Sequence, residues 1–204
     1  MKEHRTEHSE TDYSGDESIS SGRLLLLSVV SAFLYISVAL GIFYFWRDES
    51  FGQIFASGFS LPVQLLVGVI AGGAAAAVII FIMQRPPVSD VLSDFYIIRV
   101  LSQSNFSLTD HLHLSFFAGA GEEILFRGAI QPLLGNTVTS IIFVGIHGYF
   151  RFTSLGHWLF GVMMFGLSFF LGVIFSEAGL IAAMTAHAVY DVIMLQVVQR
   201  MKLV

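Results

Sequence analysis

The sequence contains no cysteine and little charge. The absence of cysteine from its 204 residues excludes disulfide bonds, thiolate metal sites and a cysteine nucleophile. Only 12% of the residues are charged, whereas 55% are hydrophobic, and the mean hydropathy is +0.76. A water-soluble chain with this composition would have too little polar surface to stay in solution. The composition therefore indicates an integral membrane protein.

Several motif classes are missing as well. The sequence has no glycine-rich phosphate-binding loop, no feature that favours nucleic acid, and no serine–histidine pattern for a nucleophile. It shows no convincing repeat between its halves, whereas many secondary transporters are built from such repeats. The formal charge of −5 comes largely from the first twenty residues, so it says little about partners.

Residues 1–22 are polar and acidic, and we expect them to form a disordered tail. The tail lacks the basic start of a signal peptide. We expect residues 23–204 to form one membrane-embedded domain, an all-α bundle of about six transmembrane helices. The expected spans are residues 24–46, 61–83, 108–134, 137–150, 155–175 and 179–199. Between the second and third, residues 88–101 predict a short interfacial helix whose apolar face carries Val88, Val91, Leu92 and Phe95.

The distribution of basic residues predicts the orientation. With six spans, eight Lys and Arg residues fall on the side that holds both termini, and Arg47 alone falls on the other. Basic residues accumulate in cytoplasmic loops, so both termini are expected in the cytoplasm. We expect a multi-pass protein of a bacterial or archaeal cell membrane. The oligomeric state is left open, because "GVIAG" at residues 68–72 favours plain helix packing over a dedicated dimer face.

Few ionisable residues remain within the expected spans, and they share one depth. Intramembrane charge costs roughly 2.5–3.5 kcal/mol per residue, so a functional site is the default interpretation. At about 1.5 Å per residue, Glu122, His147, His187 and Asp191 each lie roughly 12–18 Å from the end of their helix. We therefore expect the set to meet in one layer. Its members are Glu122, Glu123, Arg127, His147, His187 and Asp191.

Spacing within the helices divides this set. Glu123 and Arg127 are four residues apart and can form an ion pair, which could equally be a purely structural pair. Glu122 points at a different angle and stays free for chemistry. His187 and Asp191 are also four apart, so they present two polar groups side by side.

Three kinds of chemistry suit this set. Glu122 could take a proton from a water that attacks a carbonyl, with neutral imidazoles orienting the water or stabilising the oxyanion. Glu122, His147 and His187 could instead hold a divalent metal such as zinc, which would activate the water. Both routes give hydrolysis. Proton or ion transport along the same residues is the third possibility.

Three segments in order resemble the signatures of one family. "EEILFR" (residues 122–127), "FVGIH" (143–147) and "HAVYD" (187–191) are similar to the patterns E-E-x-x-x-R, F-x-x-x-H and H-x-x-x-N/D. These patterns define the CPBP intramembrane proteases, also called CAAX-protease and bacteriocin-processing or Abi proteins, which include the Rce1-type prenyl-protein proteases. The resemblance covers a core of about residues 108–199.

The resemblance implies a role for each matched residue. Glu122 corresponds to the water-activating glutamate, and His147 to the histidine that helps hold the water. His187 and Asp191 correspond to the pair proposed to stabilise the oxyanion, while Glu123 and Arg127 are the companions in the first motif. The prenyl-protein proteases have asparagine where this chain has Asp191. Asp191 either stays protonated and donates, or orients His187, or favours a metal.

The resemblance implies a glutamate-type or metal-dependent intramembrane endopeptidase. Its substrate would be a membrane-associated protein or peptide, for example a prenylated CAAX protein, with the lipid bilayer as its environment and no nucleic acid. A non-catalytic peptide-binding or immunity-type membrane protein is the main alternative, followed by a proton-coupled transporter. The candidate cofactor is a divalent metal such as zinc.

Overall fold

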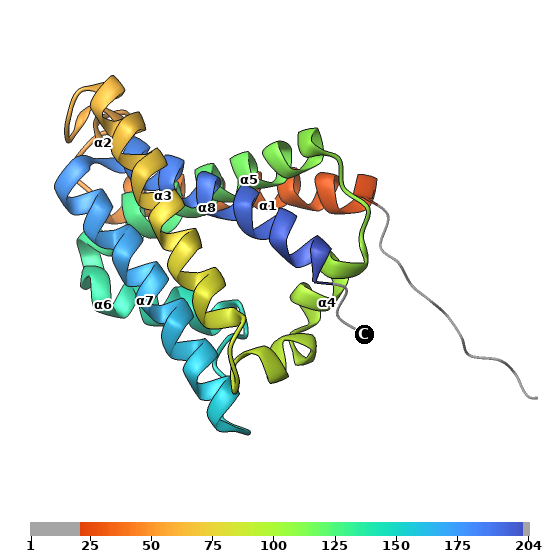
Figure 1. Ribbon diagram of the computed structural model, residues 1–204. Helices are drawn as coiled ribbons and strands as arrows, with labels where there is room; N and C mark the ends of the chain where they lie inside the picture. Colours follow the sequence, from red (N-terminus) through yellow and green to blue (C-terminus); the bar gives the residue numbers. More distant parts are fainter. Residues whose placement is uncertain (1–20, 202–204) are drawn as a thin grey trace, which may run out of the picture.

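The computed structural model describes residues 21–201 as an assembly of helices without a strand in that range (Figure 1). The predicted all-α membrane bundle is thus confirmed. The long helices are α1 (Ser21–Trp46), α3 (Leu61–Met83), α5 (Leu108–Glu123), α6 (Gln131–Ile146), α7 (Leu155–Ala178) and α8 (Leu180–Arg200). The expected tail, residues 1–22, lies outside the described residues except for Ser21 and Gly22, which begin α1.

The number of candidate membrane spans among the described residues is five rather than six. The difference arises where α5, a π-helical segment (Ile124–Ile130, η2) and α6 follow one another and form a single apolar stretch, Leu108–Ile146. The expected third and fourth spans lie in this stretch without a loop between them. Gly135 breaks its helical path with φ 77° and ψ 162°. Glycine adopts this conformation without the steric penalty of a side chain, so the chain turns within one residue.

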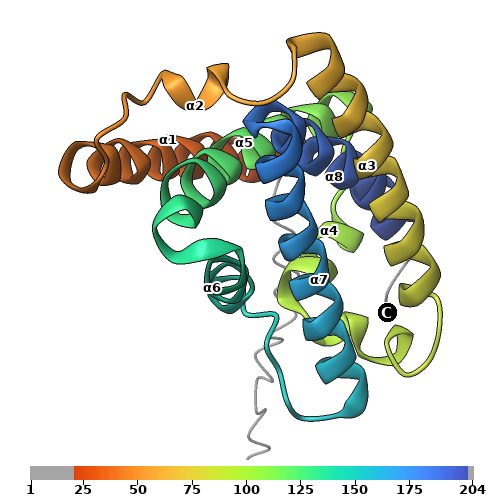
Figure 2. The same cartoon turned by 90° about the vertical axis from the view of Figure 1, so that its left-hand side faces the viewer.

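Helix α8 packs against several others and occupies the centre of the fold. It contacts α3 along its length, then α5 and α7, while α1 packs on α5 and α6 on α7. Figure 2 shows α1 and α5 running side by side, with α3 and α7 crossing their direction. Large apolar side chains on α1 and α3 stay exposed, for example Phe33, Leu66 and Ile70. Such a surface is expected of helices that face lipid.

The segment after α3 is helical, as predicted, but in two pieces. A 3₁₀ helix (Ser89–Asp94) is followed by α4 (Tyr96–Gln103). The four apolar residues expected on one face are each at most 8% exposed, and they join a core cluster with residues of α3, α7 and α8. The buried face is therefore confirmed, and its position at the membrane surface stays a prediction.

Two glycines of α3 let it approach α8 closely. A Cβ atom built on Gly68 or Gly72 would collide with backbone and side-chain atoms of Thr185, Ala186 and Val189 on α8. The "GVIAG" segment therefore serves packing within the chain, as small residues do at the interfaces of membrane helices.

This contact leads to a prediction about stability. Gly72→Leu is expected to destabilise the protein by at least about 1–3 kcal/mol, because overpacking a close helix contact forces the backbones apart. Gly73→Leu is the matched control, since a Cβ at Gly73 would meet nothing within 4 Å. Thermal unfolding in detergent measures both variants. Equal unfolding temperatures for the two would contradict the prediction.

Candidate active site

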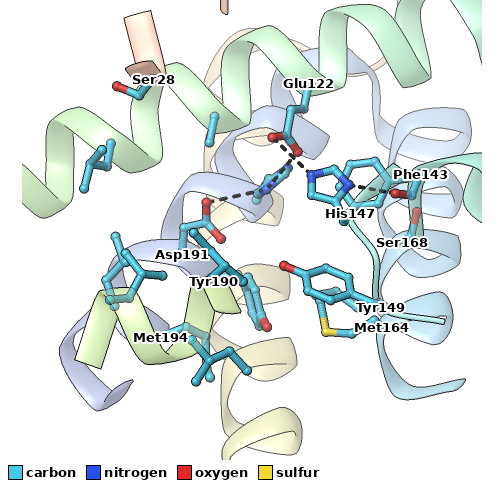
Figure 3. Close-up of a pocket in the computed structure, with 18 of the residues that line it drawn as sticks. Ser28, Glu122, Phe143, His147, Tyr149, Met164, Ser168, Tyr190, Asp191 and Met194 are labelled. Carbon is cyan, nitrogen blue, oxygen red and sulfur yellow. Dashed lines mark hydrogen bonds and ion pairs between the residues drawn. The ribbon is translucent and has the colours of Figure 1, made fainter. Parts of the chain in front are cut away.

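Four of the expected residues meet at one point, although they come from three separate helical segments. Figure 3 labels three of them, Glu122, His147 and Asp191. Glu122 lies near the end of α5, His147 caps α6, and His187 and Asp191 are one turn apart on α8. Glu122 Oε1 lies 3.6 Å from His147 Nε2, and Glu122 Oε2 lies 3.9 Å from His187 Nε2. His187 Nε2 is also 3.6 Å from Asp191 Oδ2. The residues that the sequence predicted to lie at one depth in the membrane therefore lie close together in space.

The two neighbouring glutamates point to different places, as their spacing from Arg127 predicted. Glu123 is completely buried and accepts a hydrogen bond of 3.1 Å from Arg127 Nε. Its other oxygen, Oε1, lies 2.8 Å from His187 Nδ1. Glu122 retains 13% side-chain exposure. Because a carboxylate only accepts, Nδ1 of His187 donates the proton in this contact, and Nε2 is left facing Glu122 and Asp191.

Arg127 links this site to helix α7. It lies in the π-helical segment that directly follows Glu123, and its side chain is completely buried. Its Nη2 donates to the carbonyl oxygen and to Oγ of Ser168, each at 2.8 Å. Single π-helical turns within α-helices are frequent at functional sites, because they change the direction in which side chains project. Here the turn directs Arg127 between Glu123 and α7.

Sequence reasoning missed the partners of Arg127. Ser168 lies alone among apolar residues of α7, and Gln131 follows Arg127 by four residues and donates to the carbonyl oxygen of Gly172 at 3.0 Å. Isolated polar residues in an apolar helix were the available signal, since each needs a hydrogen-bond partner inside a membrane. Which helix supplies that partner depends on tertiary packing.

The orientation of His147 is fixed by its own helix. Its Nδ1 lies 2.7 Å from the carbonyl oxygen of Phe143, one turn earlier, and its ring stacks on the Phe143 ring at 4.4 Å. A carbonyl oxygen cannot donate, so Nδ1 carries the hydrogen of this bond. The lone pair of a neutral His147 is therefore on Nε2, the atom that faces Glu122.

A cavity of about 380 Å³ opens in front of the four residues. Its walls come from α1, α4, α5, α7 and α8, and most of the side chains in them are apolar; examples are Leu24, Ile98, Leu114, Phe117 and Met194. Tyr149 and Tyr190, which sequence reasoning also missed, lie in the wall beside the charged groups (Figure 3). Their positions next to motif residues were the signal that could have found them. A few convergent polar groups in an apolar cavity are typical of a ligand site.

The remaining histidines of the described chain lie elsewhere. His157 is only 6% exposed, and its Nε2 lies 3.1 Å from Asp94 Oδ2. His111 is buried near the start of α5 and packs beside Phe106. Among residues 21–201, no three His, Asp or Glu side chains form a group that could hold a metal ion.

The fold and the site together define a class: a multi-pass integral membrane protein with a partly buried cluster of two carboxylates and two histidines facing an apolar cavity. Residues 104–193 match the family described as type II CAAX prenyl endopeptidase Rce1-like. This match confirms the resemblance drawn from the three motifs.

A curated relative is similar to part of this chain. The uncharacterized protein YpbD of Bacillus subtilis (strain 168) is 34% identical over 88 residues, which is 43% of this chain. The chain covers 44% of the length of that relative. No solved structure matches the chain significantly.

Proposed function

We propose that this protein is an intramembrane endopeptidase in which Glu122 activates a water molecule for attack on a peptide carbonyl. The observation that carries the proposal is the separation of 3.6 Å between Glu122 Oε1 and His147 Nε2 at the wall of an apolar cavity. This separation is too long for a direct hydrogen bond and suits two groups that share a water. Both atoms are proton acceptors in the assigned tautomer, so they hold the water through its two hydrogens and leave its oxygen lone pair for attack.

The proton follows a closed path in this mechanism. The water oxygen bonds to the carbonyl carbon, its proton passes to Glu122, and the carbonyl oxygen becomes an oxyanion. Glu122 then returns the proton to the leaving nitrogen as the C–N bond breaks, which gives one carboxylic acid and one amine. No metal, oxidant or other co-reactant is needed for this balance.

His187 is proposed to stabilise the oxyanion. Its Nδ1–H is held by Glu123, which in turn is held by Arg127, so the ring has little freedom to rotate. When Nε2 carries a proton, it can donate to the oxyanion from a preorganised position. Glu123 and Arg127 then act as positioning residues. Asp191, 3.6 Å from His187 Nε2, supports the charged imidazole.

The cavity supports a membrane-associated substrate. Its volume of about 380 Å³ and its largely apolar walls suit an extended peptide with apolar side chains or an attached lipid chain, including a prenylated CAAX-type protein. The walls include residues of the candidate membrane-spanning helices α1, α5, α7 and α8, which supports entry of such a substrate from the bilayer.

The orientation is proposed from the distribution of basic residues. The stretch Leu108–Ile146 is too long for one crossing at about 1.5 Å per residue, and we propose that it crosses the membrane twice with its turn at Gly135. Both termini then lie on one side together with Arg85, Arg99, Arg151 and Arg200, and Arg47 lies on the opposite side. The positive-inside rule then gives cytoplasmic termini in a bacterial or archaeal membrane. A reporter fused to each terminus tests this assignment, and a terminus found outside the cytoplasm would contradict it.

The test of the proposed function is cleavage by the purified full chain in detergent. The substrates are membrane-anchored peptides and prenylated peptides with free CAAX ends, each assayed with and without a tight chelator. We expect cleavage of members of this panel, with a rate that the chelator leaves unchanged. Loss of cleavage on chelation would contradict the metal-free mechanism and would make Glu122, His147 and His187 the metal ligands. No cleavage by a folded wild type would contradict the peptidase function.

A further inference from the structure

We propose that Tyr149 is a catalytic residue whose phenolic hydroxyl donates a hydrogen bond to the oxyanion, together with His187. The inference rests on the proposed peptidase function and adds to it a residue outside the three motifs. Four observations support the assignment: the shortage of donors in the cluster, the position of the ring, the protonated state of the phenol, and the arrangement of the other hydroxyls.

The cluster is rich in acceptors and poor in donors. Glu122, Glu123 and Asp191 bring three carboxyl groups to the site. The proton on Nδ1 of His147 is already committed to the carbonyl oxygen of Phe143. Arg127 is the nearest permanent cation, and its hydrogen bonds run to Glu123, Ser168 and Gln131. A developing oxyanion would therefore face negative groups with His187 as its single donor from the motifs, and it requires a neutral donor.

The backbone turns Tyr149 into the cavity wall and packing holds it there. Gly148, with φ 70°, reverses the chain after α6, and the amide of Tyr149 donates to the carbonyl oxygen of Val144 at 3.2 Å. The Tyr149 ring stacks on the His147 ring at 5.6 Å with an interplanar angle of 17°. The edge of Phe160 closes its other side at 5.6 Å. These contacts fix the ring before any substrate binds.

The hydroxyl end of this ring points in a useful direction. In Figure 3 it lies below Glu122 and His147 and points toward the side of Asp191 and Tyr190. Both Tyr149 and Asp191 line the same cavity. A carbonyl whose carbon is attacked from Glu122 would direct its oxygen away from that glutamate, toward the region between Tyr149 and His187.

Tyr149 keeps its proton over the range in which a peptidase works. Burial, and then the negative charges of Glu122 and Asp191, raise the pKa of Tyr149 above its ordinary value. The phenol therefore remains a neutral donor, and its hydrogen bond strengthens as the carbonyl oxygen gains charge.

The other hydroxyls in the wall are less suitable. Ser28 Oγ donates to the carbonyl oxygen of Leu25 at 2.8 Å, and Ser168 Oγ accepts from Arg127. The hydroxyl of Tyr190 points away from Asp191 in Figure 3. Tyr35 lies across the cavity on α1, with its ring packed edge-on against Phe126. Tyr35 is thus the alternative donor that an experiment must separate from Tyr149.

The test compares Tyr149→Phe with Tyr190→Phe and Tyr35→Phe in the peptide-cleavage assay. Phenylalanine keeps the ring that stacks on His147, so Tyr149→Phe is expected to unfold at the wild-type temperature. Its kcat is expected to fall by about 10²-fold with KM unchanged, as when one oxyanion donor is removed. Tyr190→Phe and Tyr35→Phe, which change the cavity wall, are expected to lose less kcat than Tyr149→Phe. The control expected to leave kcat unchanged is Tyr44→Phe, because Tyr44 is 82% exposed on α1 and does not line the cavity.

Several results would overturn the assignment. A Tyr149→Phe protein with wild-type kcat, or one that changes only KM, would show that the phenol does not stabilise the transition state. A larger loss in Tyr35→Phe would give the role to Tyr35. If Glu122→Gln is inactive while Tyr149→Phe is fully active, this inference alone fails. If the wild type does not cleave, the proposed function fails and this inference with it.

Discussion

Glu122→Gln is expected to lower kcat for peptide cleavage by about 10³–10⁴-fold, the upper part of the range for a lost general base. Glutamine has the shape of glutamate but cannot accept the proton of an attacking water. The closest histidine nitrogens to Glu122 lie at 3.6 and 3.9 Å, so the substitution breaks no short bond within the protein. We therefore expect the unfolding temperature to remain that of the wild type.

The controls for this variant are two other glutamates. Glu177→Gln changes an exposed residue near the end of α7 and is expected to leave both activity and stability unchanged. Glu123→Gln removes the carboxylate that holds Arg127 and His187, and is expected to lower both stability and kcat. The unfolding temperature should therefore distinguish Glu122→Gln, which is expected to keep the wild-type value, from Glu123→Gln, which is expected to lower it. A Glu122→Gln protein with full activity would contradict the assignment of the general base.

Arg127→Leu is expected to destabilise the protein by about 3–5 kcal/mol, the cost of leaving a buried charge without its partner. The Arg127 side chain is completely buried, as is that of Glu123. The substitution would also remove both hydrogen bonds to Ser168 and leave that carbonyl oxygen without its donor. The effect is measured by thermal unfolding in detergent, with the loss of the helical circular-dichroism signal as the readout.

Arg99→Leu provides the matched control, because Arg99 is exposed on α4. It is expected to change the free energy of unfolding by no more than about 0.5 kcal/mol. A double variant, Glu123→Gln with Arg127→Leu, removes both charges and is expected to recover part of the stability lost in Arg127→Leu, since no unpaired charge remains. Equal stability of Arg127→Leu and the wild type would show that the pair contributes nothing to the fold.

Local patterns were sufficient to predict much of the fold. The helices α3 and α8 follow apolar runs whose limits agree with the expected ones within a residue or two. The pairing of Glu123 with Arg127 follows from a separation of four residues on one helical path. The buried face of residues 88–95 follows from the helical spacing of their apolar residues. Each of these features depends on neighbours in the sequence, so the sequence is enough to predict it.

The path of the chain between residues 108 and 146 could not be predicted in the same way. Gly135 gives a turn signal, but hydropathy does not show whether a turn separates two spans or bends one stretch. The π-helical turn after Glu123 is equally invisible, because its sequence is as apolar as that of an ordinary helix. The side chains that Arg127 reaches depend on this turn, and Ser168 is 41 residues away from it in the chain.

The sequence by itself determined that the chain is an all-α membrane protein with acidic and histidine side chains at one depth, because hydropathy and helical rise are local properties. Only the tertiary structure decided the angular arrangement: Glu122 faces the cavity while Glu123 holds His187. It also brought Phe160 of α7 against Tyr149 and lined the cavity with residues of α1 and α4. These contacts join helices by packing between distant segments, and no local pattern encodes which faces will meet.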